Sequence, residues 1–221
     1  MRRLVAIGAT LLLAGGCSTV QYYAQAVSGH LDVMQRARPI EQVIAAPDTP
    51  ETLRQRLEYV QAVRAFAVSE LALPDNGSYR SYADIGRPYV GWNVFAAPEF
   101  SLQPHQNCFP LVGCVSYRGY YDFEAAEREA ERLKRAGYDV FIGGVPAYST
   151  LGWFDDPVLN TFIGYPKAEL ARLIFHELAH QIAFAKGDTQ FNESFAVAVE
   201  QEGVRRWLSK HGTPADLEAY L

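Results

Sequence analysis

The residues from Lys167 to Ala185, KAELARLIFHELAHQIAFA, form the segment that most restricts how this chain folds. They contain neither Gly nor Pro, so an α-helix can run through all of them without interruption. Most of the side chains around the two histidines are apolar, which is typical of a helix that is buried. The sequence therefore predicts a long buried helix over 167–185 that carries polar side chains at its centre.

Those polar side chains form the string HELAH. Residues four apart lie on one face of a helix, about 6 Å apart along its axis, so His176 and His180 can both bring an imidazole nitrogen to one cation. Glu177 lies about 100° around the helix, outside direct contact with that cation but near enough to take a proton from its water. The alternative is a buried helix with two hydrogen-bonded histidines. Burying these groups without compensation is costly, so a zinc site is favoured.

A catalytic zinc site of this type needs a third protein ligand. The acidic residues and the histidine that follow HELAH are the candidates: Asp188, Glu193, Glu200, Glu202 and His211. Glu193 fits best, because Gly187 ends the first helix and a second helix can return Glu193 to a place opposite HELAH. Glu200 lies two turns further along the same face and is an alternative ligand or a group that orients a histidine. Asp188 is a further alternative ligand.

The first seventeen residues, MRRLVAIGATLLLAGGC, differ in character from the rest. A positive start precedes about ten apolar residues, too few to cross a bilayer core of about 30 Å, so residues 1–17 are predicted to be a secretory signal. The small residues before Cys17 resemble the lipobox of bacterial lipoproteins. This resemblance implies that Cys17 carries lipid and anchors the chain in the cell envelope, with Ser18 favouring the outer membrane. The alternative is ordinary cleavage, with Cys17 incidental.

An exported chain folds in an oxidising compartment, which affects how the other two cysteines are interpreted. Cys108 and Cys114 lie in NCFPLVGCVSY, and their spacing can close a small disulfide loop. A metal-binding role is disfavoured, because no histidine or second cysteine pair stands nearby. We therefore predict a disulfide that holds this loop.

The remaining segments predict an α+β fold, with a small mixed or antiparallel sheet packed on helices. A helical stripe of Tyr23, Ala26, Val27, Leu31 and Met34 comes first, and a capped helix over about 49–71 follows. Strands are predicted in YVGWNVFAA, VSYRGYY and YDVFIGGVPAY, with a helix between the last two that Asp122 caps and Gly137 ends. Residues 18–221 are expected to form one domain. The net charge of −5 provides no basic surface for nucleic acid.

A peptide-cleaving site also needs an edge that aligns substrate and a donor for the developing oxyanion. The strand that precedes the HELAH helix is a candidate edge. Tyr148 at its end is a candidate donor, although a purely packing role is the alternative. Glu99, Asp155 and Asp156 are candidates for recognising a free α-amino group, and spacing does not select among them.

The chain resembles the bacterial putative aminopeptidase family of predicted zinc-dependent lipoproteins. The resemblance rests on long strings across the mature chain, among them LPDNGSYRSYAD, GGVPAYSTLGWFDDPVLNTF, LIFHELAHQIAF and GDTQFNESFAVAVEQEGVRRW. It implies a zincin-like metallopeptidase of the gluzincin type, with His176, His180 and Glu193 as zinc ligands and Glu177 as general base. Members commonly continue past the segment that matches GVRRWL, so this chain is expected to be shorter than its family at the C-terminal end.

These features together predict a zinc-dependent peptidase, an aminopeptidase by resemblance, that acts on peptides at the periplasmic face of the envelope. One alternative is a zinc-binding envelope lipoprotein that has lost catalysis and serves a structural or interaction role. Intact Glu177 argues against it, because a structural site prefers four protein ligands and has no use for a base. A metal-free envelope scaffold is the third possibility.

Overall fold

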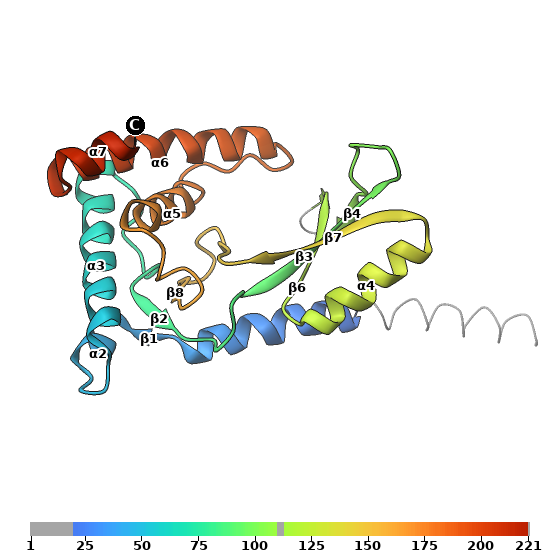
Figure 1. Ribbon diagram of the computed structural model, residues 1–221, viewed down its shortest axis with the longest axis horizontal. Coiled ribbons are helices and arrows are strands. Elements are labelled where there is room, and N and C mark those ends of the chain that lie inside the picture. The colour runs from blue at the N-terminus through green and yellow to red at the C-terminus, as the bar shows by residue number, and fades with distance from the viewer. Residues whose placement is uncertain (1–19, 110–112, 221) are drawn as a thin grey trace, which may run out of the picture. The chain divides into compact units, whose positions relative to one another are not determined.

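The computed structural model describes residues 20–109 and 113–220, which pack as two compact units (Figure 1). Of the described residues, unit 1 comprises 20–35, Gly91–Asn107 and Ser116–Gly144, and unit 2 comprises Arg36–Val90, 108–109, 113–115 and 145–220. Each unit combines helices with short strands, which confirms the predicted α+β class. The single domain over 18–221 stays a prediction, and the signal segment with Cys17 lies outside the described residues.

Unit 1 is built on a three-stranded sheet in the order β6-β3-β7. Its strands are β3 (Gly91–Pro98), β6 (Tyr117–Tyr120) and β7 (Tyr138–Val145), which confirms the three predicted strands. β3 runs antiparallel to β6, with Trp92 opposite Tyr120. Helix α4 (Phe123–Arg135) packs on β3 and β6. The apolar core between them consists of Val94, Ala96, Tyr120, Ala126, Ala130 and Leu133.

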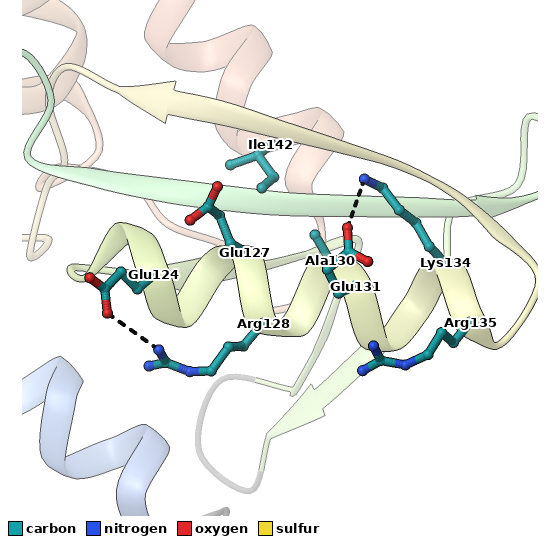
Figure 2. Close-up of a pocket in the computed structure, with 8 residues that line it drawn as sticks. All are labelled: Glu124, Glu127, Arg128, Ala130, Glu131, Lys134, Arg135 and Ile142. Atoms are coloured by element: carbon teal, nitrogen blue, oxygen red, sulfur yellow. Dashed lines mark hydrogen bonds and ion pairs between the residues drawn. The ribbon is translucent and has the colours of Figure 1, made fainter.

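Helix α4 begins and ends as the sequence predicts. The Asp122 side chain accepts a hydrogen bond of 2.7 Å from the Ala125 amide, and Gly137 follows the last turn with a φ of 87°. The exposed side carries ion pairs one turn apart, including Lys134 with Glu131 at 3.2 Å (Figure 2). These side chains and Ile142 of β7 line an open recess. None of the predicted site residues lies in it, so α4 serves as a solvated cover for the sheet.

The helix over residues 20–36 also belongs to unit 1 up to Gln35. The Tyr22 ring meets the Tyr120 ring edge to face at 5.6 Å, and Gln25 accepts a hydrogen bond of 3.0 Å from the Tyr121 amide. Gly29 permits this approach, because a Cβ atom there would lie 2.2 Å from the Tyr121 ring. The helix is where the sequence predicts it. Among the described residues, no helix is both long and apolar enough to cross a membrane.

Unit 2 is mainly helical. Its helices are α2 (Ile40–Ala45), α3 (Glu51–Leu71), α5 (Lys167–Ala179), α6 (Thr189–His211) and α7 (Pro214–Tyr220). A small mixed sheet joins β1 (Arg38–Pro39), β2 (Ser81–Ala83) and β8 (Val158–Leu159), with β1 antiparallel and β8 parallel to β2. The small mixed sheet therefore matches the predicted type.

A two-stranded ribbon of β4 (Asn107–Phe109) and β5 (Gly113–Val115) carries the two remaining cysteines. The structure joins Cys108 to Cys114 in a disulfide. The bond closes the loop between the two strands, as the spacing predicted, and neither sulfur atom is left to hold a metal.

Helix α5 is shorter than predicted. The sequence favoured a helix over 167–185, whereas α5 ends at Ala179 with His180 as its C-terminal cap. The backbone then tightens, because the Gln181 amide donates to the Leu178 carbonyl and the Ile182 amide to the Ala179 carbonyl. Periodicity does not reveal this end, since neither Gly nor Pro marks it. His180 keeps a helical φ and ψ, so the two histidines still share one face.

The core of unit 2 forms where α5 packs against α3 and α6. Phe175 of α5 is fully buried and lies 6.1 Å from Phe66 of α3, measured between ring centroids. Gly203 of α6 faces the same ring, and a Cβ atom there would lie 2.8 Å from Phe175 and 2.9 Å from Leu71. The missing side chain therefore lets α6 approach α5 and α3 closely.

We predict that Gly203→Ala destabilises the protein by about 1–3 kcal/mol, because the new methyl group has to displace a buried ring. In an uncrowded helix the same change would stabilise by up to about 1 kcal/mol. Gly164→Ala is the matched control, since a Cβ atom at Gly164 meets nothing within 4 Å. Chemical denaturation measures both. Equal free energies of unfolding for the two variants would contradict the close approach.

Candidate metal centre

The three predicted ligands meet at one point of unit 2. The Nε2 atoms of His176 and His180 lie 3.1 Å apart. The Glu193 carboxylate of α6 places one oxygen 3.4 Å from the first nitrogen and the other 3.7 Å from the second. The three residues thus offer ligand atoms that all lie within 4.8 Å of one another. Among the described residues, this is the group of histidine and acidic side chains able to hold a metal ion.

These spacings fit a tetrahedral cation. Donor atoms about 2.0–2.2 Å from a tetrahedral zinc lie roughly 3.3–3.6 Å from each other, close to the separations observed here. Two imidazole nitrogens and one carboxylate also form a typical donor set of a catalytic zinc with an open fourth position. Glu193 is 55% exposed, so the cluster is open to solvent on its side.

The second nitrogen of His176 has a carboxylate partner. Nδ1 lies 2.8 Å from Oε2 of Glu200, which is buried, and the same oxygen accepts a hydrogen bond of 3.0 Å from Arg172. This contact places the imidazole proton on Nδ1, so the lone pair on Nε2 points toward His180 and Glu193. Of the two roles considered for Glu200, this contact favours the one in which it orients His176, and Glu200 is not in the group of candidate ligands.

The beginning of α6 determines where Glu193 lies. Asp188 caps the helix by accepting a hydrogen bond of 2.9 Å from the Phe191 amide. The buried amide of Asn192 bonds both backbone groups of Ala185, at 2.7 Å and 2.9 Å, and so ties the linker to the first turn. Glu193 is the next residue and faces the histidines. Asp188 is thus a helix cap, and it is not among the three residues whose ligand atoms cluster.

The other downstream candidates have partners elsewhere. Glu202 forms exposed ion pairs with Arg205 and Arg206, both at 2.7 Å. His211 stacks on Trp207, with ring centroids 4.2 Å apart. These contacts explain both residues as parts of the α6 surface and leave Glu193 as the candidate third ligand.

Glu177 lies beside the ligands in a poorly solvated environment. Burial raises the pKa of its carboxyl to about 7, and the Glu193 and Asp156 carboxylates add to this effect while His176 opposes it. Burial lowers the pKa of His180, and neighbouring His176 lowers it further. Both shifts favour uncharged groups where a cation is absent. A carboxyl group with a pKa near neutrality can both accept and return a proton.

A buried tyrosine that the sequence did not single out lies in the same neighbourhood. Tyr79 is 2% exposed, and its hydroxyl has no hydrogen-bond partner among the described residues. Burial raises the pKa of this phenol well above its ordinary value, and the charges of Glu177 and Asp156 and the hydroxyl of Tyr148 contribute. Tyr148 is half-buried, and its contribution to the pKa of Tyr79 indicates that the two tyrosines lie near each other. The role of Tyr148 as an oxyanion donor stays a prediction.

The segment that carries Tyr79 is held by the buried guanidinium group of an arginine. Arg64 of α3 is 2% exposed and donates to the carbonyls of Pro74, Asn76 and Ser78. The Asn76 amide in turn donates to Gln181 at 2.7 Å, and Gln181 donates to the Ser78 hydroxyl at 3.2 Å. Because Gln181 directly follows His180, this network supports the end of α5. An Asn-Gly turn after Pro74 was the one sequence signal for it.

The two aspartates proposed to recognise an α-amino group behave differently. Asp156 is 1% exposed, and its carboxylate accepts hydrogen bonds from the amide and hydroxyl of Thr150 at 2.8 Å and 2.9 Å. This side chain therefore stabilises the turn before β8. Asp155 is exposed and lies against Gly77, while Glu99 is an exposed residue of unit 1.

The arrangement as a whole defines a candidate divalent-metal site with an adjacent carboxyl group on an α+β scaffold. A family model described as "Putative aminopeptidase" matches residues 21–221. Because this match covers nearly the whole chain, the protein belongs to that family, as the resemblance of its sequence predicted. The family name points to a peptide hydrolase. No curated protein and no solved structure matches the chain.

We predict that Glu200→Gln weakens zinc binding about 10–100-fold, because the neutral amide no longer stabilises the proton on His176 Nδ1. Glu202→Gln is the matched control, since Glu202 lies on the same helix but makes only exposed ion pairs. Competition titration against a zinc-binding dye measures both. An unchanged zinc affinity in Glu200→Gln, with the fold intact by circular dichroism, would show that Glu200 does not orient the ligand.

Proposed function

We propose that this protein is a zinc-dependent peptidase, and an aminopeptidase as its family name suggests, with a zincin-like arrangement of the active-site helix. The observation that carries the proposal is the convergence of His176, His180 and Glu193 on one point with Glu177 beside them. Two nitrogens and one carboxylate are enough to hold zinc and leave a position for water. Glu177 can then act as a base for that water, a role that a purely structural zinc site does not need.

The three ligands would hold one zinc ion per chain. When bound, the ion supplies a Lewis acid and a water whose pKa is near 7. His176 and His180 contribute their Nε2 atoms, and Glu200 keeps the first of these imidazoles in the tautomer that leaves Nε2 free to bind. Glu193 brings a negative charge that partly balances the cation.

Glu177 supplies the proton transfers. Its carboxylate accepts a proton from the attacking water, and the resulting carboxylic acid donates that proton to the amine nitrogen that leaves. Burial raises the pKa of this carboxyl in the metal-free protein, and a bound cation beside it would favour the carboxylate form that accepts the proton. Tyr148 is proposed to donate a hydrogen bond to the carbonyl oxygen of the scissile peptide. The substrate class is therefore a peptide, and no contact with nucleic acid is proposed.

We predict that Glu177→Gln retains zinc and loses at least about 100-fold in kcat, since general base catalysis typically contributes about 10²–10⁴-fold. Metal content by mass spectrometry and cleavage of a peptide library measure the two effects. Removal of zinc by a chelator should abolish the wild-type activity, and added zinc should restore it.

Three outcomes would contradict this proposal in different ways. Wild-type protein that binds zinc but cleaves no peptide would support a structural or interaction role for the metal. Wild-type protein that binds no zinc would exclude both the peptidase and the structural metal site. If peptides with blocked and free N-termini are cut equally well, the protein is a peptidase but not an aminopeptidase.

We also propose that the chain is a lipoprotein of the bacterial envelope, with the periplasmic face of the outer membrane favoured. The support is the sequence of residues 1–17, with small residues before Cys17. Cells fed a labelled fatty acid should incorporate it into the wild-type protein, whereas Cys17→Ser should remain unlabelled and be released from the membrane fraction. Equal labelling of both proteins would rule out Cys17 as the lipidated residue.

A further inference from the structure

The helix over residues 20–36 exposes an apolar face. Val20, Ala24, Val27 and Leu31 follow one another at spacings of four, three and four, which places them in one line along the helix. We name these four residues the apolar stripe. Val20 is 69% exposed, Val27 59% and Leu31 49%, and they line a single hollow on the surface of unit 1.

The opposite face of this helix packs against the protein and mixes polar and apolar residues, since buried Val33 and half-buried Tyr22 also lie on it. It contains Gln25, whose side chain bonds the Tyr121 amide, and Gly29, which lies against the Tyr121 ring. A surface helix of a globular protein normally turns its apolar stripe toward the core. Here the apolar stripe faces outward instead, while the contacts of Tyr22, Gln25 and Gly29 hold the other face against unit 1. Contiguous apolar surface of this kind typically marks a site for a membrane or another protein.

The position of the apolar stripe in the chain favours a membrane. Only Ser18 and Thr19 separate Cys17 from Val20, and an extended chain covers at most about 3.6 Å per residue step, so three steps keep the two Cα atoms within about 11 Å of each other. A lipid on Cys17 would therefore hold the first turn of the helix at the bilayer surface. From Val20 to Leu31 the apolar stripe extends about 17 Å along the helix axis and contains no charged residue.

We propose that the apolar stripe lies in the interfacial region of the phospholipid bilayer that anchors Cys17, with the helix parallel to the membrane surface. Interfacial helices bury an apolar face about 5–10 Å deep, at the boundary between headgroups and acyl chains. The lipid then provides attachment, while the apolar stripe holds unit 1 in one orientation against the membrane. This inference is independent of the peptidase activity and rests on the proposed lipid anchor.

The test uses the chain from Cys17 to Leu221, coupled through the Cys17 thiol to maleimide lipids in phosphatidylcholine vesicles. A tryptophan is introduced by Val27→Trp, which keeps the apolar stripe apolar, and the fluorescence of the parent protein corrects for Trp92, Trp153 and Trp207. In vesicles with brominated acyl chains, we expect the emission of the added tryptophan to fall roughly twofold or more, because the bromine atoms quench at the depth of an interfacial helix.

Two matched controls define the result. Glu127→Trp places the same probe on the exposed side of α4 and should show no quenching by brominated lipid. Adding Leu31→Asp to Val27→Trp should remove the quenching, whereas adding Arg135→Gln, an equal change of charge on α4, should preserve it. Val27 and Leu31 are exposed, so these changes leave the folded state intact, which thermal unfolding verifies.

Quenching of Val27→Trp no greater than that of Glu127→Trp would overturn the proposal. Concentration-dependent dimerisation of the untethered chain that Leu31→Asp abolishes, together with no quenching, would instead assign the apolar stripe to a second copy of the protein. Chemical coupling replaces the natural lipid in this experiment. A failure of Cys17 lipidation in cells is therefore distinguishable from a failure of the helix to enter the interface.

Discussion

The packing of α6 against α5 is the interaction on which the candidate centre depends. Both histidines lie on α5 and its C-terminal cap, whereas Glu193 and Glu200 lie on α6. Gly203 permits the two helices to approach closely at Phe175, and Asn192 ties the linker to the first turn of α6. Two carboxylates seven residues apart then reach one histidine from two directions: Glu193 faces Nε2, and Glu200 bonds Nδ1.

Several polar groups are buried around this centre, and each imposes an energetic cost unless it is hydrogen-bonded. Arg64 meets part of that cost, because its Nε and Nη2 atoms donate to three backbone carbonyls while Nη1 has no partner among the described residues, and Asp156 accepts hydrogen bonds from Thr150. Glu177 and Tyr79 are different: burial raises the pKa of both groups, and the Tyr79 hydroxyl has no hydrogen-bond partner among the described residues. Groups of this kind concentrate at functional sites, where substrate or metal completes their surroundings.

Local sequence patterns predicted most of the elements and the three residues that cluster as candidate ligands. The spacing of HELAH, the cap at Asp122 and the alternation in the strands depend on a few consecutive residues, and the structure contains each of these elements. The end of α5 at Ala179 was missed, because contacts with Asn76, Ser78 and Asn192 determine the path that follows it. The hydrogen bonds by which Arg64 holds residues 74–78, and the burial of Tyr79 near Glu177, were missed for the same reason. Each depends on residues distant in sequence.

The N-terminal helix shows a different limit of sequence reasoning. Periodicity predicted the helix, but only Val27 and Leu31 of the predicted stripe belong to the exposed apolar stripe, and a period of 3.6 does not reveal whether an apolar face meets the core or another surface. In the structure Val27 and Leu31 are exposed, and Gln25 and Gly29 make the contacts with unit 1. The division of the chain into two compact units was likewise not predicted, because it depends on which distant segments pack together.

X-ray absorption spectroscopy of the zinc-loaded protein tests the central claim most directly. A site formed by His176, His180 and Glu193 predicts one zinc per chain, with two imidazole nitrogens at about 2.0–2.1 Å and oxygen donors at about 2.0–2.2 Å. His176→Ala should remove one imidazole contribution from the spectrum or abolish binding. A sulfur contribution, fewer than two imidazoles in the wild type, or a spectrum unchanged in His176→Ala would contradict the assignment of the metal to this cluster.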